Sequence, residues 1–139
     1  MNILLLEDDA YIADALEDIL VHHGHQIIYA YDIHDANDNL EDYDIDLIIT
    51  DLNLKPRGLS EPQISQTMDG MLTGYIWLRD CAFKKDMKFK NNSIIFSAYE
   101  SELRDNIDEN ELKGLTILSK EVNLTDKVKL ILEKLDKKS

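Results

Sequence analysis

Five short apolar runs, spaced along the whole chain, constrain the fold more than any other feature of this sequence. A run that is apolar at every position and only a few residues long is typical of a strand buried on both faces, as in a parallel sheet. Between the runs, apolar residues recur at helical spacing. The expected strands are residues 2–7, 26–30, 45–50, 93–96 and 115–118, and the expected helices are residues 10–22, 35–40, 70–83, 101–107 and 125–137. This alternation predicts an α/β protein with a five-stranded, doubly wound parallel sheet.

Length and charge narrow the function classes. A chain of 139 residues suits one domain, so we expect a single domain over residues 1–139 with no appended output domain. The net charge of −13 repels nucleic acids and anionic membrane surfaces, so neither is expected as a partner. Cys81 is the only cysteine, which excludes an internal disulfide, and we find neither a signal peptide nor an apolar run long enough to span a membrane. These features favour a cytoplasmic location.

Polar residues follow four of the expected strands at the point where each strand ends. They are Glu7 and Asp8 after the first strand, Asp51 after the third, Ser97 after the fourth and Lys120 after the fifth. Parallel strands place their carboxyl ends at one edge of the sheet, and open α/β sheets bind ligands at that edge. We therefore expect these five side chains to surround one cleft.

The residue types in this cleft indicate phosphoryl chemistry. Glu7, Asp8 and Asp51 would repel one another unless a cation lies among them, and oxygen ligands in a hydrated cleft favour Mg²⁺ over zinc. An aspartate at a strand end can act as a nucleophile and form an aspartyl phosphate. The ammonium group of Lys120 and the hydroxyl of Ser97 would then contact phosphoryl oxygens.

With these residues in place, the whole chain resembles a response-regulator receiver domain of two-component signalling. The acidic pair, the strand-end aspartate, the serine followed by Ala98 and the final lysine occur in the family's order. Asn53 matches the position whose backbone carbonyl completes the metal shell. Met68-Asp69-Gly70 resembles the Met-Asp-Gly sequence that opens the third helix of the family.

The resemblance implies a flavodoxin-like sheet in the order 2-1-3-4-5. It implies Asp51 as phosphoacceptor and Mg²⁺ held by Asp8, Asp51 and the Asn53 carbonyl, with Glu7 acting through water. Such a protein takes its phosphoryl group from a sensor histidine kinase or a histidine phosphotransfer protein. The resemblance implies that the protein is not an enzyme, although slow hydrolysis of its own aspartyl phosphate is compatible with this class of protein. It signals by contact with a downstream protein target, which the sequence does not name, and homodimerisation is also compatible with it.

Several positions depart from the family pattern and leave alternatives open. The connection over residues 52–69 contains both prolines and is about a dozen residues longer than usual. It could cap the cleft, bind a partner or extend into solvent. Glu121 stands where the family has proline. Ile117 stands where the family has an aromatic side chain that moves on activation, and Tyr99 could serve as the moving aromatic residue instead. A pseudo-receiver that binds partners without turning over phosphate is therefore the first alternative. A Mg²⁺-dependent phosphatase is the second, although Asn53 is not the second acid that such enzymes use.

Overall fold

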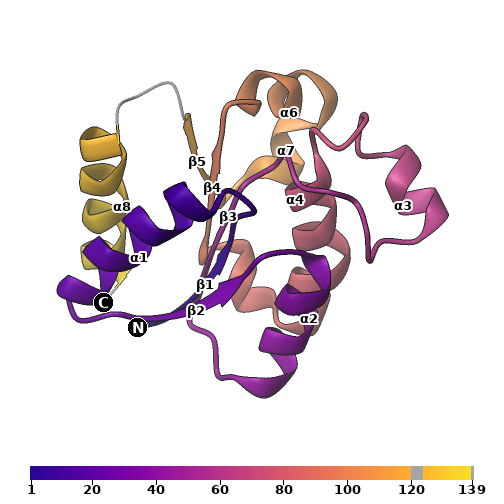
Figure 1. Ribbon diagram of the computed structural model, residues 1–139. Coiled ribbons are helices and arrows are strands. Elements are labelled where there is room, and N and C mark those ends of the chain that lie inside the picture. The colour runs from indigo at the N-terminus through magenta and orange to yellow at the C-terminus, as the bar shows by residue number, and fades with distance from the viewer. Residues whose placement is uncertain (120–123, 139) are drawn as a thin grey trace.

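The computed structural model describes residues 1–119 and 124–138. Its sheet has five parallel strands in the order β2-β1-β3-β4-β5, which confirms the predicted doubly wound, flavodoxin-like fold (Figure 1). The strands are β1 (Asn2–Leu6), β2 (Gln26–Ala30), β3 (Leu47–Thr50), β4 (Ser93–Ser97) and β5 (Thr116–Ser119). Each lies within two residues of its predicted bounds, because short apolar runs leave little freedom in where a buried strand begins.

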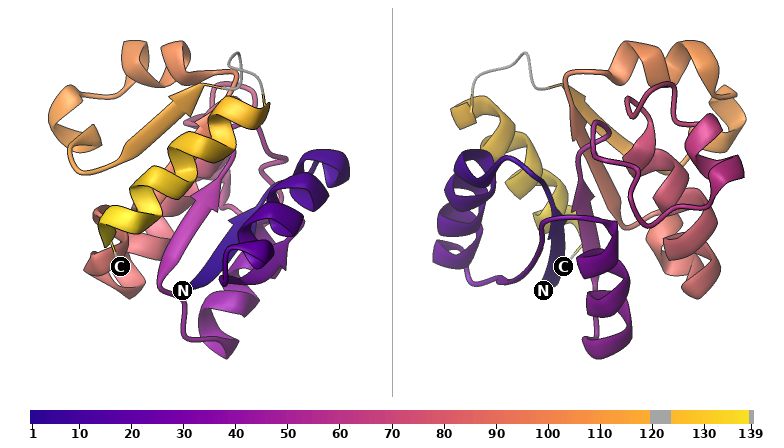
Figure 2. Two further views of the ribbon diagram at one scale, coloured as in Figure 1. Left: turned by 90° about the vertical axis from the view of Figure 1, so that its left-hand side faces the viewer. Right: turned by 45° about the vertical axis from the view of Figure 1, so that its right-hand side comes forward.

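Helices cover both faces of the sheet (Figure 2). One face carries α1 (Ala10–His22), at its predicted bounds, and α8 (Leu124–Lys138). The other face carries α2 (Ile33–Asp42), α4 (Thr73–Trp77), the π-helix η1 (Leu78–Ala82), α5 (Phe83–Lys85), the 3₁₀ helix η2 (Met87–Lys90), α6 (Glu100–Asn106) and α7 (Glu109–Leu112). The predicted helix over residues 70–83 is thus a composite that begins at Thr73.

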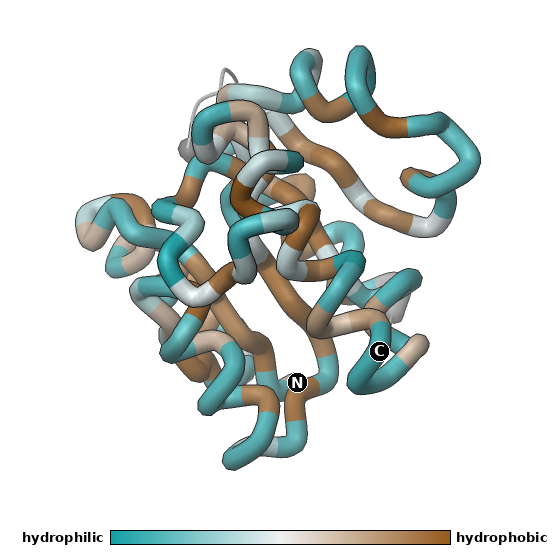
Figure 3. The backbone as a smooth tube through the Cα atoms, turned by 90° about the vertical axis from the view of Figure 1, so that its right-hand side faces the viewer, coloured by the Kyte–Doolittle hydropathy of each residue, from teal (hydrophilic) through white to brown (hydrophobic). Residues whose placement is uncertain are grey.

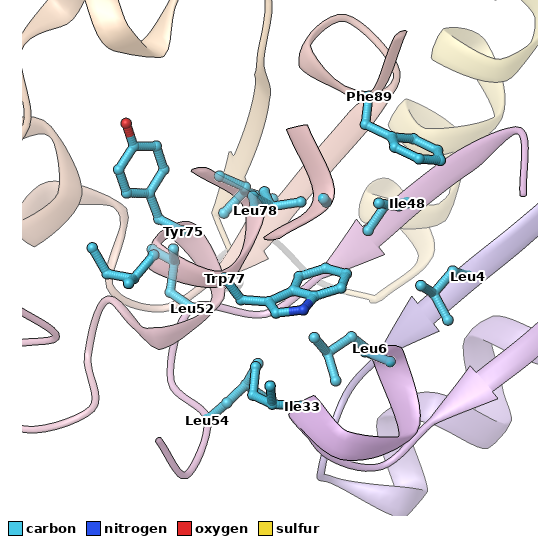
Figure 4. Packing of buried hydrophobic residues seen from close by; sticks show 14 of the residues in the cluster. Leu4, Leu6, Ile33, Ile48, Leu52, Leu54, Tyr75, Trp77, Leu78 and Phe89 are labelled. Carbon is cyan, nitrogen blue, oxygen red and sulfur yellow. The ribbon is translucent and has the colours of Figure 1, made fainter. Parts of the chain in front are cut away.

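Alternate residues of each strand supply the two hydrophobic cores. In β1, Leu4 and Leu6 face the core under α2 and α4, whereas Ile3 and Leu5 face the core under α1 and α8. Figure 4 shows Trp77 packed among these side chains, and its indole nitrogen donates to Asn37 Oδ1 at 2.8 Å. In Figure 3 the strands run as hydrophobic segments through the interior, and the surrounding helices are mostly hydrophilic.

The long connection between β3 and α4 is folded. It contains the short helix α3 (Glu61–Ser65), which lies outside α4 (Figure 1). A capping box begins α3: Gln63 N donates to Ser60 Oγ, and Ser60 N donates to Gln63 Oε1. Leu54 and Leu59 reach the core, and Gln63 Nε2 donates to Asp80 Oδ2 at 3.1 Å. Of the three alternatives left open by the sequence, extension into solvent is therefore wrong.

The Met-Asp-Gly sequence does not open a helix, so this prediction was wrong. Met68, Asp69 and Gly70 have φ angles of 53°, 58° and 91° and form a turn with three consecutive left-handed residues. Such a turn ends one helical segment and cannot begin another, because a right-handed helix needs negative φ. The helix that follows β3 begins three residues later, at Thr73.

Candidate functional site

Three carboxylates meet at the carboxyl edge of the sheet. Glu7, Asp8 and Asp51 each offer an oxygen, and these oxygens all lie within 4.8 Å of one another. The pairing of β1 with β3 brings them together, since Leu6 is in register with Thr50. Glu7 and Asp51 are only 2% and 6% exposed, and Asp8 is half-buried. Burial strengthens their mutual repulsion, so the arrangement favours a bound cation.

The donor atoms of this cluster fit a hard divalent cation. All three side chains offer oxygen, and the cluster contains neither the imidazole nor the thiolate that zinc prefers. Asp8 adjoins an open cavity, which leaves room for the water ligands that Mg²⁺ retains in proteins. Glu7, Asp8 and Asp51 are therefore suited to hold Mg²⁺ with part of its hydration shell.

Local hydrogen bonds orient the Asp51 carboxylate. Its Oδ1 accepts from the backbone amides of Leu52 at 2.7 Å and Asn53 at 3.3 Å, as in an Asx turn. The backbone amide of Asp51 donates to the carbonyl of Leu6 at 3.1 Å, and the Thr50 hydroxyl donates to the Asp51 carbonyl at 2.9 Å. The backbone amides of the two residues that follow Asp51 therefore orient its carboxylate at the end of β3.

Gly74, in the first turn of α4, packs directly against the backbone of Asp51. A Cβ atom at this position would lie 1.9 Å from the carbonyl oxygen of Asp51. The amide of Gly74 also donates to the carbonyl of Leu52 at 3.0 Å. Sequence reasoning assigned the helix-opening role to Gly70 and missed Gly74, although a glycine near the start of the helix after β3 was a visible signal.

Tyr29 supports the end of β1 beside the acidic pair. Its hydroxyl donates to the backbone carbonyl of Glu7 at 2.6 Å, and the amide of Glu7 donates to the carbonyl of Ala30 at 3.2 Å. Burial raises the pKa of Tyr29, and the negative charges of Glu7 and Asp8 raise it further. No sequence signal marked this tyrosine, because its partner is a backbone atom.

The long connection forms one wall of the cleft. A cavity of about 280 Å³ lies beside the carboxylates, with Asp8 on one side and Leu54, Lys55, Pro56, Asp69 and Gly70 on the other. The exposed Asn53 also lines it. The extra residues of this chain therefore border the open space beside the three carboxylates.

The remaining predicted site residues are Ser97, at the end of β4, and Lys120, which follows β5 in the sequence. Ser97 is fully buried at the end of β4, opposite Ser119 of β5, and its Oγ accepts from the amide of Tyr99 at 3.1 Å. Tyr99 and Ile117 are both half-buried and pack against the core on the α4 side of the sheet. Lys120 and Glu121 lie outside the residues that the structure describes.

Comparison with known proteins supports the fold. No protein-family model and no curated protein matches the chain. Among solved structures, it is similar to a CheY-like receiver domain protein from Methanospirillum hungatei, with 23% identity, a TM-score of 0.68 and coverage of 98% of this chain and 94% of that one.

It is also similar to the receiver domain of Francisella response regulator 1452, with 20% identity, a TM-score of 0.63 and coverage of 99% of this chain and 98% of that one. A third similar structure is response regulator TrrA from Thermotoga maritima, solved in complex with Mg²⁺ and BeF. Its identity is 21%, its TM-score is 0.66, and the match covers 96% of this chain and 97% of that one. The chain thus has the fold of response-regulator receiver domains over nearly its full length. Among the described residues, no helix is both long enough and apolar enough to cross a membrane.

Proposed function

We propose that this chain is a phosphoacceptor response regulator of a two-component system or phosphorelay, phosphorylated on Asp51. The observation that carries the proposal is the convergence of Glu7, Asp8 and Asp51 within 4.8 Å at the carboxyl edge of a receiver fold. The structurally similar TrrA supports the proposal, since that protein, with the same fold, was solved in complex with Mg²⁺ and BeF.

The proposed metal site uses the residues at this edge. Asp8, Asp51 and the backbone carbonyl of Asn53 would hold Mg²⁺, and Glu7 would act through a water molecule. When bound, the ion would neutralise negative charge on the phosphoryl oxygens. The hydrogen bonds to Asp51 Oδ1 keep the carboxylate in one orientation, which lowers the entropy cost of an in-line reaction.

In the proposed reaction, an oxygen of Asp51 attacks the phosphorus of a phosphohistidine on a sensor kinase or a phosphotransfer protein. The O–P bond forms as the N–P bond breaks, and the electron pair returns to the imidazole nitrogen, which is protonated from solvent. Ser97 and Lys120 would contact phosphoryl oxygens of the aspartyl phosphate. The aspartyl phosphate carries about −1.5 to −2 charge where the free carboxylate carried about −1, so the transfer makes an already acidic site more negative.

The new charge would draw Ser97 and Lys120 toward Asp51 and shift the segments that follow β4 and β5. These shifts change the surface that a downstream protein reads. We propose that the chain acts in the cytoplasm, through protein contact and not through chemistry on a small substrate, apart from slow hydrolysis of its own aspartyl phosphate.

Acetyl phosphate with Mg²⁺ tests this function, with intact-protein mass spectrometry as the readout. Wild type should gain one phosphoryl group, and Asp51→Ala should gain none. Asp69→Ala is the matched control, because Asp69 borders the same cavity but is not in the carboxylate cluster. A mass gain that persists in Asp51→Ala, or that is lost equally in both variants, would refute the assignment of Asp51.

The pseudo-receiver remains the second candidate, and Ile117 is the observation that favours it. A branched aliphatic side chain stands half-buried where the family uses a moving aromatic ring. A pseudo-receiver would take up no phosphoryl group from acetyl phosphate at any Mg²⁺ concentration, whereas the phosphoacceptor takes up one.

A further inference from the structure

A small apolar groove lies on the side of the molecule where the long connection meets α6. Leu72 and Ile76, both about 1% exposed, form its floor. Gln66 and Met68 of the connection also line it, together with Asn106 at the end of α6 and Ile107 just after it. Met68 is 38% exposed and is one of eight large apolar side chains that are exposed to solvent among the described residues.

The size of the groove suits side chains of a peptide. Its volume is about 280 Å³, below the ~300–1,000 Å³ of small-molecule sites. Helix-in-groove recognition needs room only for the few anchoring side chains of an amphipathic segment. Methionine adapts its shape to such anchors, because it is unbranched and polarizable.

The charge around the groove indicates which kind of segment it binds. Residues 100–112, which include α6 and α7, contain six acidic residues and only one basic residue. Asp105 and Asp108, on either side of the groove residues Asn106 and Ile107, are both exposed. Arg79, which also borders the groove, is held in an ion pair with Asp80 at 2.7 Å. A cationic segment is therefore attracted, whereas a second copy of this chain, with its net charge of −13, is repelled.

We propose that this groove binds a basic amphipathic segment of a partner protein, with apolar side chains over Leu72 and Ile76 and basic side chains toward the acidic α6–α7 region. Gln66 and Met68 of the long connection help to form the groove, whereas none of the three clustered carboxylates lines it.

The turn that supplies Met68 also links the groove to the carboxylate cleft. Met68 lines the groove, whereas Asp69 and Gly70 line the cavity beside Asp8. Gly70 lies against the carbonyl of Leu54 and the side chain of Asn53, so little space separates the turn from the cleft. An occupant of the cleft that moves the turn also moves one wall of the groove. This link, unlike the groove, rests on the proposed function.

A designed peptide tests the groove. The probe is a labelled 14-residue helix with leucine on one face and lysine on the other, titrated with the full chain at 0.15 M salt and followed by fluorescence anisotropy. One comparison peptide has glutamate in place of lysine, and another has the same composition in scrambled order. The lysine helix should bind at least about tenfold more tightly than either comparison peptide.

Met68→Ala should weaken binding of the lysine helix by about fivefold, because an apolar wall is lost. The matched control is Met87→Ala in η2, since Met87 is 69% exposed and does not border the groove. Unchanged Trp77 fluorescence in both variants verifies that they fold. Equal affinities of the two variants, equal binding of the scrambled peptide, or self-association of the chain that Met68→Ala abolishes would overturn the proposal.

Adding Mg²⁺ with beryllofluoride to the wild type tests the link. The affinity for the lysine helix should change at least twofold, and the helix should change the affinity for Mg²⁺ and beryllofluoride by the same factor, since coupling is reciprocal. An unchanged affinity overturns the link and leaves the groove in place. The mass gain from acetyl phosphate is measured without peptide, so failure of the proposed function is recognised separately.

Discussion

Replacing Gly74 by alanine would press a methyl group into the backbone that carries Asp51. The added Cβ would lie 1.9 Å from the Asp51 carbonyl oxygen and 2.9 Å from its carbonyl carbon, whereas real Cβ atoms essentially never come within 3.0 Å of a neighbour. The first turn of α4 and the end of β3 must therefore separate by about 1 Å at this point. Neither partner can yield as a flexible side chain would, because the contact is with backbone.

The expected loss of stability follows from two opposing effects. Alanine favours the helical state over glycine by about 1 kcal/mol. Overpacking by one methyl group against a fixed neighbour costs about 3 kcal/mol, at the upper end of the usual range. The net loss is about 2 kcal/mol, which corresponds to a fall in Tm of about 7 °C for a domain of this size.

Urea unfolding followed by Trp77 fluorescence measures this loss. Trp77 is the only tryptophan and is fully buried, so its emission reports on the core directly. Gly24→Ala is the control, because Gly24 has φ of +90° but nothing within 4 Å of its added Cβ. This variant should lose about 1 kcal/mol from backbone conformation alone and keep the Mg²⁺ affinity of the wild type. If Gly74→Ala is as stable as the wild type, or more stable, helix propensity dominates and the close contact is refuted.

Two further predictions concern side chains that hold the site and the long connection. The hydrogen bond from Arg79 holds the pKa of Asp80 below its ordinary value of 3.8. Asp80 therefore stabilises the fold fully at pH values well above 3.8, and this contribution is lost as the pH falls from there through the lower pKa of the folded state. Asp80→Asn should therefore show a shallower loss of unfolding free energy between about pH 5 and pH 3 than the wild type, and an unchanged slope would contradict this. Tyr29→Phe removes the hydrogen bond to the Glu7 carbonyl and should weaken Mg²⁺ binding about fivefold by calorimetry. Tyr11→Phe, at an 80% exposed tyrosine, should not change it, and equal affinities in both variants would exclude a role for Tyr29.

The sheet was predictable because buried parallel strands leave a strong sequence signal. Their apolar runs fixed the strand positions, and the alternation with helices fixed the doubly wound topology. Once the strands are parallel, the residues after β1 and β3 must share an edge, which is why Glu7, Asp8 and Asp51 could be grouped from the sequence.

Features that depend on few residues or on backbone partners were not predictable in the same way. Helix α3 is too short to show a period, and only the spacing of Ser60 and Gln63 marked its start. The similarity of Met68-Asp69-Gly70 to a family sequence was misleading, because the close contact with Asp51 is made by Gly74. A sequence motif cannot reveal which of two nearby glycines lies against a backbone carbonyl.

The position of Gly74 also explains how the chain accommodates a long connection without disturbing the site. The segment leaves β3 after Asp51 and returns to the same point, where the amide of Gly74 donates to the carbonyl of Leu52. Lengthening a flexible loop from about 6 to about 18 residues costs only about 1 kcal/mol in closure entropy, because the cost grows with the logarithm of length. Burial of Leu54 and Leu59, each worth about 1.5 kcal/mol or more, is enough to offset that cost. The connection can therefore line both the cavity beside Asp8 and the groove over Leu72 and Ile76, while its two ends keep Asp51 in place.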